Sequence, residues 1–249
     1  MNSSLELSVV IPAYNEEQRL PRTIGRIREY LHRLHPASEI IVVDDASSDR
    51  TGEIVRSLQK NIPELRLLAH HDRNHGKGRS VRTGMLEARG NFSLFTDADL
   101  SAPIEEAEKL LAALNSADIA IGSRALDRSL IQVHQSRARE LSGIFFNRIV
   151  RLATGLPFAD TQCGFKAFRT ARSRIIFEQQ RIEDFGFDPE ILFLARRHGL
   201  RAVEVPVVWS HEPGTKIRMF RDSARMFTDL LKIRWNAARG RYPQRAAGA

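Results

Sequence analysis

The chain has 249 residues, of which 42% are hydrophobic, and it carries a formal net charge of +8. A chain of this length can bury a substantial core as one large domain. Its single cysteine, Cys163, excludes an intrachain disulfide and indicates a reducing compartment. The first residues lack the pattern of a signal peptide, and no apolar run is long enough for a membrane span. We therefore expect a cytoplasmic protein that is soluble or peripheral on the inner face of a membrane.

Predicted strands and helices alternate along the first half of the chain. Buried strands are expected at 7–13, 39–43, 65–68, 92–96 and 118–122. Helices are expected between them, from residue 16 with Asn15 as its N-cap, from residue 47, at 81–88 and at 104–114. This alternation predicts an α/β fold in which a mostly parallel, doubly wound sheet carries helices on both faces.

The pattern changes after about residue 125. A basic loop at 124–139 leads into a helix through Phe145, Ile149 and Leu152, and a compact segment follows at 160–168. We interpret this half as an extension of the same domain.

The C-terminal segment 211–249 is basic, with nine Lys/Arg against three Asp/Glu. A helix from 218 to 235 would place one apolar row opposite a basic face, and the row is Phe220, Ala224, Phe227, Leu231 and Trp235. This pattern is typical of a helix lying in an anionic membrane interface, with a helix docked on the core as the alternative. Nucleic acid is not expected as a partner, because the segment contains no recognisable binding motif.

Polar residues follow three of the predicted strands. The turn 14–16 follows the first strand, Asp44 and Asp45 end the second, and Asp97 and Asp99 follow the strand at 92–96. Parallel strands end at one edge of a sheet, so these groups can converge on one ligand. Paired carboxylates can hold Mg²⁺ or Mn²⁺ and leave positions for a diphosphate, whereas the alternative is that they cap the next helix.

A glycine-containing segment at 74–80 opens the helix that precedes the 92–96 strand. Its glycines permit close backbone approach, and Lys77 adds a cation near the helix N-terminus. The spacing is not that of a Walker A loop, and an ordinary glycine turn is the alternative.

Several ordered motifs resemble a known family. The runs VVIPAYNE (9–16), IVVDDASSDRT (41–51) and TDADL (96–100) look like family 2 glycosyltransferases of the GT-A type. The runs GSR (122–124), DTQCGFK (160–166) and WSHEPGTK (209–216) are similar to dolichyl- and polyprenyl-phosphate glycosyltransferases. The DTQCGFK run resembles the β-glucosyltransferase branch more than the mannose branch.

The resemblance implies a domain organisation and a role for each candidate site residue. Residues 1–210 would form the GT-A domain, with a nucleotide-sugar half at 1–124 and an acceptor half at 125–210, and 211–249 would be a basic, membrane-peripheral extension. The metal would bind Asp97 and Asp99. The donor would be bound by Pro12, Tyr14, Glu16, Asp44, Asp45, Lys77 and Asp97. Ser101 stands where mannose-transferring relatives often have a glutamine ligand, so its metal role is open.

The implied reaction is inverting transfer of a hexose, glucose from UDP-glucose, onto a polyprenyl or dolichyl phosphate. A bound cation stabilises the charge that grows on the leaving diphosphate. A phosphate acceptor is already an oxyanion near neutral pH, so it needs cations rather than a base. The candidate acceptor-phosphate residues are Arg124, Arg137 and Lys216, with Arg139 beside them, and the candidate catalytic residues are Asp99, Arg124 and Asp188.

Other readings stay open at this stage. Asp184 and Asp188 stand where hydroxyl-using relatives place a base, but either can instead cap a helix or orient an acceptor-side lysine. Asp188, directly before Pro189, fits a helix N-cap. A family 2 transferase using GDP-mannose or a soluble acceptor is the nearest alternative function. A nucleotidyltransferase or a non-enzymatic polyanion-binding protein is more distant.

Overall fold

A computed structural model describes residues 5–70, 72–133, 137–211 and 219–243. The first half contains β1 (Leu7–Ala13), α1 (Leu20–Leu34), β2 (Ser38–Asp45), α2 (Thr51–Gln59), β3 (Leu65–His70), α3 (Lys77–Glu87) and β4 (Phe92–Thr96). A short 3₁₀ turn (Ile104–Glu106), α4 (Ala107–Ala113) and β5 (Ile119–Ser123) follow. The alternation expected from the sequence is therefore present, with the helix predicted at 104–114 divided into two pieces.

The second half contains a further 3₁₀ turn (Arg128–Leu130) and the elements β6 (Ile131–Val133), α5 (Arg137–Thr154), β7 (Phe165–Arg169), α6 (Thr170–Gln179), α7 (Phe187–Arg197), β8 (Ala202–Pro206), β9 (Trp209–Ser210) and α8 (Met219–Ala238). β6 and β9 pair in a small separate sheet. The basic loop predicted at 124–139 thus holds a strand, and the helix after it begins at Arg137.

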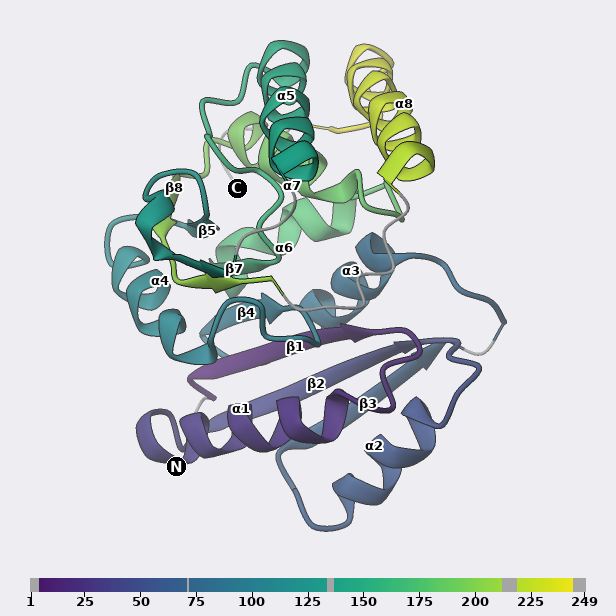
Figure 1. Ribbon diagram of the computed structural model, residues 1–249, viewed down its shortest axis with the longest axis vertical. Helices are drawn as coiled ribbons and strands as arrows, with labels where there is room; N and C mark the ends of the chain where they lie inside the picture. The colour runs from purple at the N-terminus through teal and green to yellow at the C-terminus, as the bar shows by residue number, and fades with distance from the viewer. Residues whose placement is uncertain (1–4, 71, 134–136, 212–218, 244–249) are drawn as a thin grey trace.

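The central sheet has seven strands in the order β3-β2-β1-β4-β7-β5-β8 (Figure 1). β1 runs parallel to β2 and β4, β2 runs parallel to β3, and β5 runs parallel to β8. β7 is antiparallel to both β4 and β5, between which it lies. The chain leaves β5 and returns to β7 at the same edge of the sheet, so β7 must run back through it. The predicted mostly parallel α/β sheet is confirmed.

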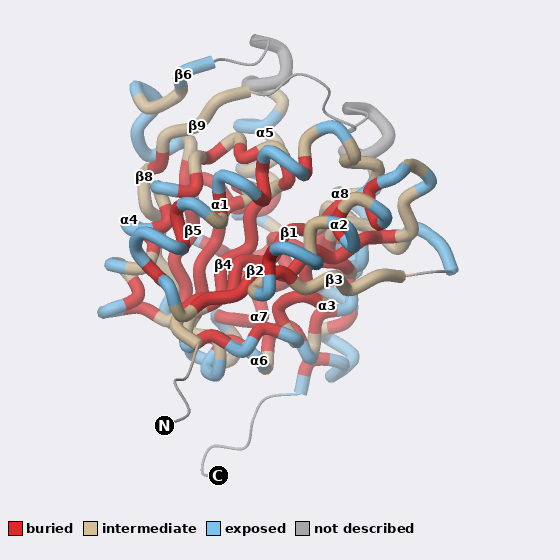
Figure 2. The backbone as a smooth tube through the Cα atoms, turned by 90° about the horizontal axis from the view of Figure 1, so that it is seen from below, coloured by how far each residue is buried: buried red, intermediate tan, exposed pale blue. Residues whose placement is uncertain are grey.

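Two apolar layers cover the two faces of the sheet. The strands beneath them are buried, as the red tube in Figure 2 shows. On one face, Val9 and Ile11 of β1 pack in a cluster with α1, α2 and α4. On the other face, Val10 packs in a cluster with α3, α6 and α7. Because neighbouring residues of a strand point to opposite faces, the continuous apolar run of β1 serves both layers.

The predicted Asn15 cap is wrong. α1 begins only at Leu20, after Arg19, and Asn15 takes a left-handed conformation with φ of 54°. Its Oδ1 accepts hydrogen bonds from the backbone N–H of Ser48 (2.8 Å) and Asp49 (3.3 Å). Asn15 therefore joins the loop after β1 to the loop after β2 instead of starting the helix.

α8 is docked on the core along one side, as one of the two alternatives for the C-terminal helix predicted. It packs on the protein through Leu230 and Ile233, which are buried. Phe227, Leu231 and Trp235 of the predicted apolar row remain exposed. Within the described part of the chain, no helix is long and apolar enough to cross a membrane.

Candidate active site

The carboxyl ends of β1, β2 and β4 lie side by side, because β1 pairs with both other strands. Ala13 at the end of β1 is in register with Asp44, and the buried Asp44 and Asp45 end β2. The expectation that the polar strand ends share one edge is therefore confirmed as geometry. Pro12 is half-buried in β1, and Tyr14 is exposed in the loop that follows.

Hydrogen bonds to backbone groups hold this end of the site. Glu16 donates its backbone N–H to Thr51 Oγ1 (2.8 Å), and Asp44 accepts the N–H of Ser47 (3.2 Å). Asp45 accepts the N–H groups of His75 (3.0 Å) and Gly76 (2.7 Å). The Asp45 carboxylate thus fixes the loop that leads into α3.

Asp97 and Asp99 stand in the turn after β4. Neither caps the following 3₁₀ turn, whose N-cap is Pro103 without a side-chain hydrogen bond, so the capping alternative is wrong. Asp99 Oδ1 accepts the N–H of Ser101 (3.0 Å), which closes the turn in which Leu100 has φ of 49°. Burial and the neighbouring Asp97 carboxylate raise the pKa of Asp99. A bound cation would relieve this repulsion between two carboxylates.

The donor set suits a hard divalent cation that keeps open positions. Among the described residues no three His, Cys, Asp or Glu side chains gather as a metal cage. Because carboxylate oxygens are hard ligands, the two carboxylates on one turn fit a Mg²⁺ or Mn²⁺ ion whose remaining ligands would come from phosphate oxygens and water.

Lys77, the first residue of α3, pairs with Asp97 at 2.5 Å. Burial lowers the pKa of Lys77, but the Asp97 and Asp188 carboxylates outweigh it and raise the pKa overall. Gly76 has φ of 103°, and a Cβ there would lie 2.7 Å from the carbonyl oxygen of Glu183. A Cβ on Gly78 would lie 2.6 Å from Phe187 Cβ. The glycines therefore let α3 pack closely on the loop before α7 and aim Lys77 at Asp97.

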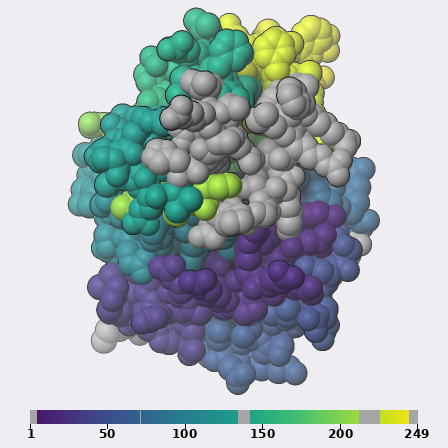
Figure 3. Space-filling view, viewed as in Figure 1, coloured from purple at the N-terminus to yellow at the C-terminus, as the bar shows by residue number. Residues whose placement is uncertain are grey.

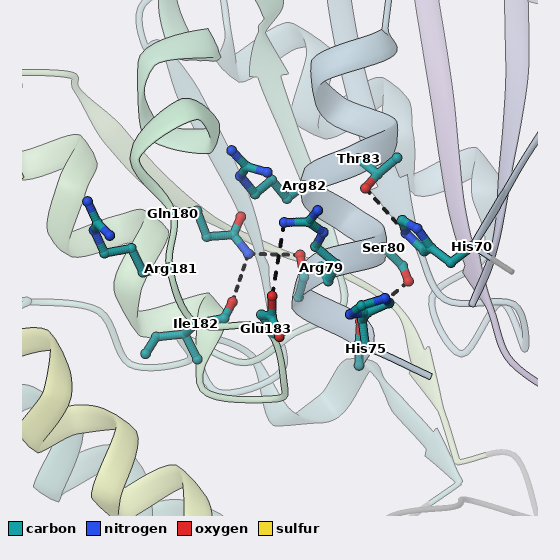
Figure 4. Close-up of polar contacts among 12 residues, drawn as sticks. His70, His75, Arg79, Ser80, Arg82, Thr83, Gln180, Arg181, Ile182 and Glu183 are labelled. Atoms are coloured by element: carbon teal, nitrogen blue, oxygen red, sulfur yellow. Dashed lines mark hydrogen bonds and ion pairs between the residues drawn. The ribbon is translucent and has the colours of Figure 1, made fainter. Parts of the chain in front are cut away.

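Figure 4 shows part of this contact between α3 and the segment 180–183, which follows α6. Gln180 Nε2 donates to the carbonyl oxygens of Gly78 (2.8 Å) and Ile182 (3.0 Å). The N–H of Arg79 donates to the carbonyl oxygen of Glu183 (2.9 Å). The helix that carries Lys77 is thus tied to the loop that leads into α7.

Gly164 is a site residue to which the sequence reasoning gave no role. A Cβ at this position would lie 2.1 Å from Asp97 Oδ2 and 2.6 Å from Asp97 Cγ. The backbone of the loop before β7 therefore forms the wall against which the Asp97 carboxylate rests. Gly164 lies within the DTQCGFK run, so the sequence indicated the motif but not that Gly164 would contact Asp97.

Lys166 is a second residue to which the sequence reasoning gave no role by name, although a pairing of Asp188 with an acceptor-side lysine was one of the alternatives. Its side chain is 0% exposed, and its Nζ donates to Asp188 Oδ1 and to the carbonyl oxygen of Cys163 (2.6 Å). Asp188 lies inside the first turn of α7, whose N-cap is Gly186, so the predicted N-cap role is wrong. Burial raises the pKa of Asp188 even though Lys166 and Lys77 act to lower it.

Arg124 is fixed by a bidentate ion pair. Its Nε and Nη2 donate to Asp160 Oδ2 (2.6 Å) and Oδ1 (2.9 Å), and its backbone N–H donates to Oδ2 (3.1 Å). Burial would raise the pKa of Asp160, but the Arg124 guanidinium lowers it to about 2. Arg124 also lies 5.5 Å from the centroid of the Trp209 ring. It lines a pocket together with Ile144, Asn147 and Trp209.

The side chains of two predicted acceptor-phosphate residues lie outside the described part of the structure. Lys216 lies outside the described residues. Arg137 lies at the start of α5, and its side chain, like that of Arg139, is outside the described part.

Fold and strand-end carboxylates together define a GT-A glycosyltransferase, an enzyme that transfers sugar from an activated donor. A solved glucosyl-3-phosphoglycerate synthase from Mycobacterium tuberculosis, in complex with Mn²⁺, UDP and glucosyl-3-phosphoglycerate, has the same fold. Its TM-score is 0.65 at 16% identity, over 98% of this chain and 82% of that chain.

The chain belongs to glycosyl transferase family 2, whose model matches residues 8–171. It is similar to a dolichyl-phosphate β-glucosyltransferase from Drosophila melanogaster, at 38% identity over 245 residues, or 92% of this chain and 74% of the relative. A human protein of the same name is 35% identical over 243 residues, or 92% of this chain and 75% of the relative. The resemblance inferred from the motifs is confirmed, including the glucosyltransferase branch.

Proposed function

We propose that the protein transfers glucose from UDP-glucose to a polyprenyl or dolichyl phosphate, with inversion at the anomeric carbon. One observation carries the proposal: two cations are held near the Asp97–Asp99 turn. Lys77 is in contact with Asp97, and Arg124 is locked to Asp160 while the Asp97 carboxylate also acts to raise the Arg124 pKa. The names of the similar glucosyltransferases support the choice of sugar and acceptor.

Asp97 and Asp99 are proposed as the ligands of Mg²⁺ or Mn²⁺, and Ser101 Oγ is the candidate for a further ligand. When bound, the ion supplies Lewis-acid stabilisation of the leaving diphosphate. Lys77 then exchanges its contact with Asp97 for the donor phosphates. Its place at the N-terminus of α3 suits a negatively charged group.

The nucleoside is proposed to lie over Pro12, Tyr14 and Glu16 at the ends of β1 and β2. Asp44 and Asp45 act there mainly by shaping the loops, because both carboxylates already accept backbone N–H groups. Residues 1–124 thus form the donor half, and 125–210 form the acceptor half.

The acceptor half favours a substrate that is already an anion. Asp188 occupies the position considered for a general base, but it is 4% exposed and is covered by Lys166. A hydroxyl acceptor needs a base within hydrogen-bond reach, whereas a monophosphate with a second pKa of about 6 does not. Arg124, Arg137 and Lys216 are proposed to position that phosphate. We propose that the enzyme acts at the cytoplasmic face of a membrane, because a lipid-linked acceptor phosphate would lie at a membrane surface.

A donor and acceptor matrix tests this function. The purified chain is assayed with UDP-glucose or GDP-mannose, with Mn²⁺, Mg²⁺ or EDTA, and with a short polyprenyl phosphate or 3-phosphoglycerate. We expect product only with UDP-glucose, a divalent cation and the polyprenyl phosphate. Transfer from GDP-mannose, or to the soluble acceptor alone, would replace the proposed substrates with the alternative ones. Transfer that persists in EDTA would refute the metal site.

A further inference from the structure

Two helices that are far apart in the sequence leave an apolar surface at one end of the molecule. α5 and α8 lie side by side there, at the opposite end from α2 (Figure 1), and both reach the surface in Figure 3. Phe145 and Leu152 of α5 are 65% and 87% exposed. Phe227, Leu231 and Trp235, each one turn after the last on α8, are between 47% and 58% exposed. We call these five residues the α5–α8 apolar face.

This exposure is not a result of weak packing of the helices. Each helix is anchored by its other side, α5 through Val150 and α8 through Leu230 and Ile233, all of which are at most 1% exposed. These anchors belong to the same buried cluster as α7. The exposed residues are therefore held outward by a rigid support, and leaving several large apolar side chains in water is unfavourable.

Only positive charge borders the apolar face among the described side chains of the two helices. Arg148, Arg151, Lys232 and Arg234 are exposed. The single acidic side chain there, at 142–154 and 225–238, is Asp229, which is buried and pairs with Lys232 at 2.8 Å. Arg239 stacks on the Trp235 ring at 4.1 Å from its centroid. A second copy of the chain across this face would place cations against cations, whereas an anionic lipid surface complements both the charge and the apolar residues.

One of the two helices that carry the apolar face, α5, also lines the pocket beside Arg124. Gly143, Ile144 and Asn147 of α5 line that pocket, and Phe145 and Arg148 are their immediate neighbours in the same helix. A bilayer on the apolar face would therefore lie against the helix that also lines the Arg124 pocket.

We propose that the α5–α8 apolar face docks on the surface of an anionic bilayer and presents the Arg124 pocket to lipid-linked phosphates. Docking through two helices goes beyond attachment by a basic C-terminal helix alone. The orientation toward the acceptor rests on the function proposed above, whereas the docking itself rests only on this surface.

Vesicle flotation of the full chain, without acceptor, tests the docking. The paired variants Phe145→Ser/Leu152→Ser and Leu231→Ser/Trp235→Ser are compared with Leu34→Ser, which removes a side chain that is 45% exposed on α1. We expect binding to phosphatidylserine vesicles, a loss of about tenfold or more in each paired variant, and none in Leu34→Ser. Salt at about 1 M should also weaken binding, because it screens the cations. Equal binding by all variants would overturn the proposal, as would a dimer in solution that the paired variants dissolve.

A second measurement separates this proposal from the proposed function. Glucosyl transfer to a detergent-dispersed short-chain polyprenyl phosphate should be unchanged in the paired variants, while transfer to the same lipid in phosphatidylserine vesicles should fall about tenfold or more. Vesicle binding without transfer to any lipid phosphate would refute the function but leave the docking surface intact. An equal loss of transfer in both formats would show that the variants damage the site, and would overturn the assignment of these residues to docking.

Discussion

The two halves of the active site are built from different kinds of contact. In the proposed donor half, most candidate side chains lie at or just after the end of a strand and are held by nearby loops, as Asp45 is held by the N–H groups of His75 and Gly76. Lys77 is the exception, because it begins α3 and pairs with Asp97. In the proposed acceptor half, the contacts are ion pairs between distant segments, Lys166 with Asp188 and Asp160 with Arg124, the last residue of the donor half. The difference shows which site residues sequence motifs can predict. Motifs predict the residues that the strand order alone brings together, but they do not predict residues whose partners lie far along the chain.

The largest effect is expected in the Asp97–Asp99 turn. Asp99→Asn should lower glucosyl transfer by about 10³-fold or more, because one charged cation ligand is lost, with little change in Tm. Steady-state kinetics and thermal unfolding check this. Asp72→Asn, at an exposed loop position, is the control and should keep full activity. Retained activity in Asp99→Asn would move the metal site elsewhere.

A pair of lysine variants compares the two halves directly. Lys166→Met leaves the Asp188 carboxylate buried and uncompensated, and should lower the free energy of unfolding by about 3–5 kcal/mol. Lys77→Met, whose partner Asp97 is partly exposed, should cost at most about 1 kcal/mol, yet lower transfer about 10²-fold. Urea unfolding and kinetics measure both.

The variant Lys166→Met/Asp188→Leu should recover much of the lost stability, because no unpaired charge remains. Similar stability losses for Lys166→Met and Lys77→Met would remove the proposed contrast between a structural and a functional ion pair.

Gly164→Ala should lower transfer by about 10–100-fold, because its methyl group would displace the Asp97 carboxylate. Gly25→Ala is the matched control. It lies inside α1 with nothing within 4 Å of the new Cβ, and should leave activity unchanged while stabilising the helix by up to about 1 kcal/mol. Wild-type kinetics in Gly164→Ala would show that Asp97 tolerates a shift.

The Arg124–Asp160 pair should give a smaller, pH-dependent effect. The pKa of Asp160 is about 2 in the folded protein, against about 3.9 for an unperturbed aspartate. A depressed carboxyl pKa stabilises the folded state above the unfolded value, and this contribution is lost as the pH falls toward the folded value. The free energy of unfolding of the wild type should therefore exceed that of Asp160→Asn by about 2 kcal/mol near neutral pH. This difference should shrink between about pH 4 and pH 2.

Urea unfolding of both proteins over a pH series measures this difference. In the variant Arg124→Met/Asp160→Asn, the pH-dependent contribution of this pair should be absent. If the difference in free energy of unfolding between wild type and Asp160→Asn stays constant through the acidic range, Arg124 does not depress the pKa of Asp160.

The amino-acid sequence by itself determined the parallel α/β sheet, the polar strand ends and the family, because buried strands and the motifs that follow them are local patterns. Capping was predicted less well: Asn15 and Asp188 both have cap-like neighbours in sequence, but tertiary partners engage them instead. Only the tertiary structure decided that β7 runs antiparallel inside the sheet, that Gly164 supports Asp97, that Lys166 covers Asp188, and that α8 buries Leu230 while exposing Leu231. Each of these features depends on which distant segment packs against the residue. The local hydrophobic pattern around a residue does not specify that segment.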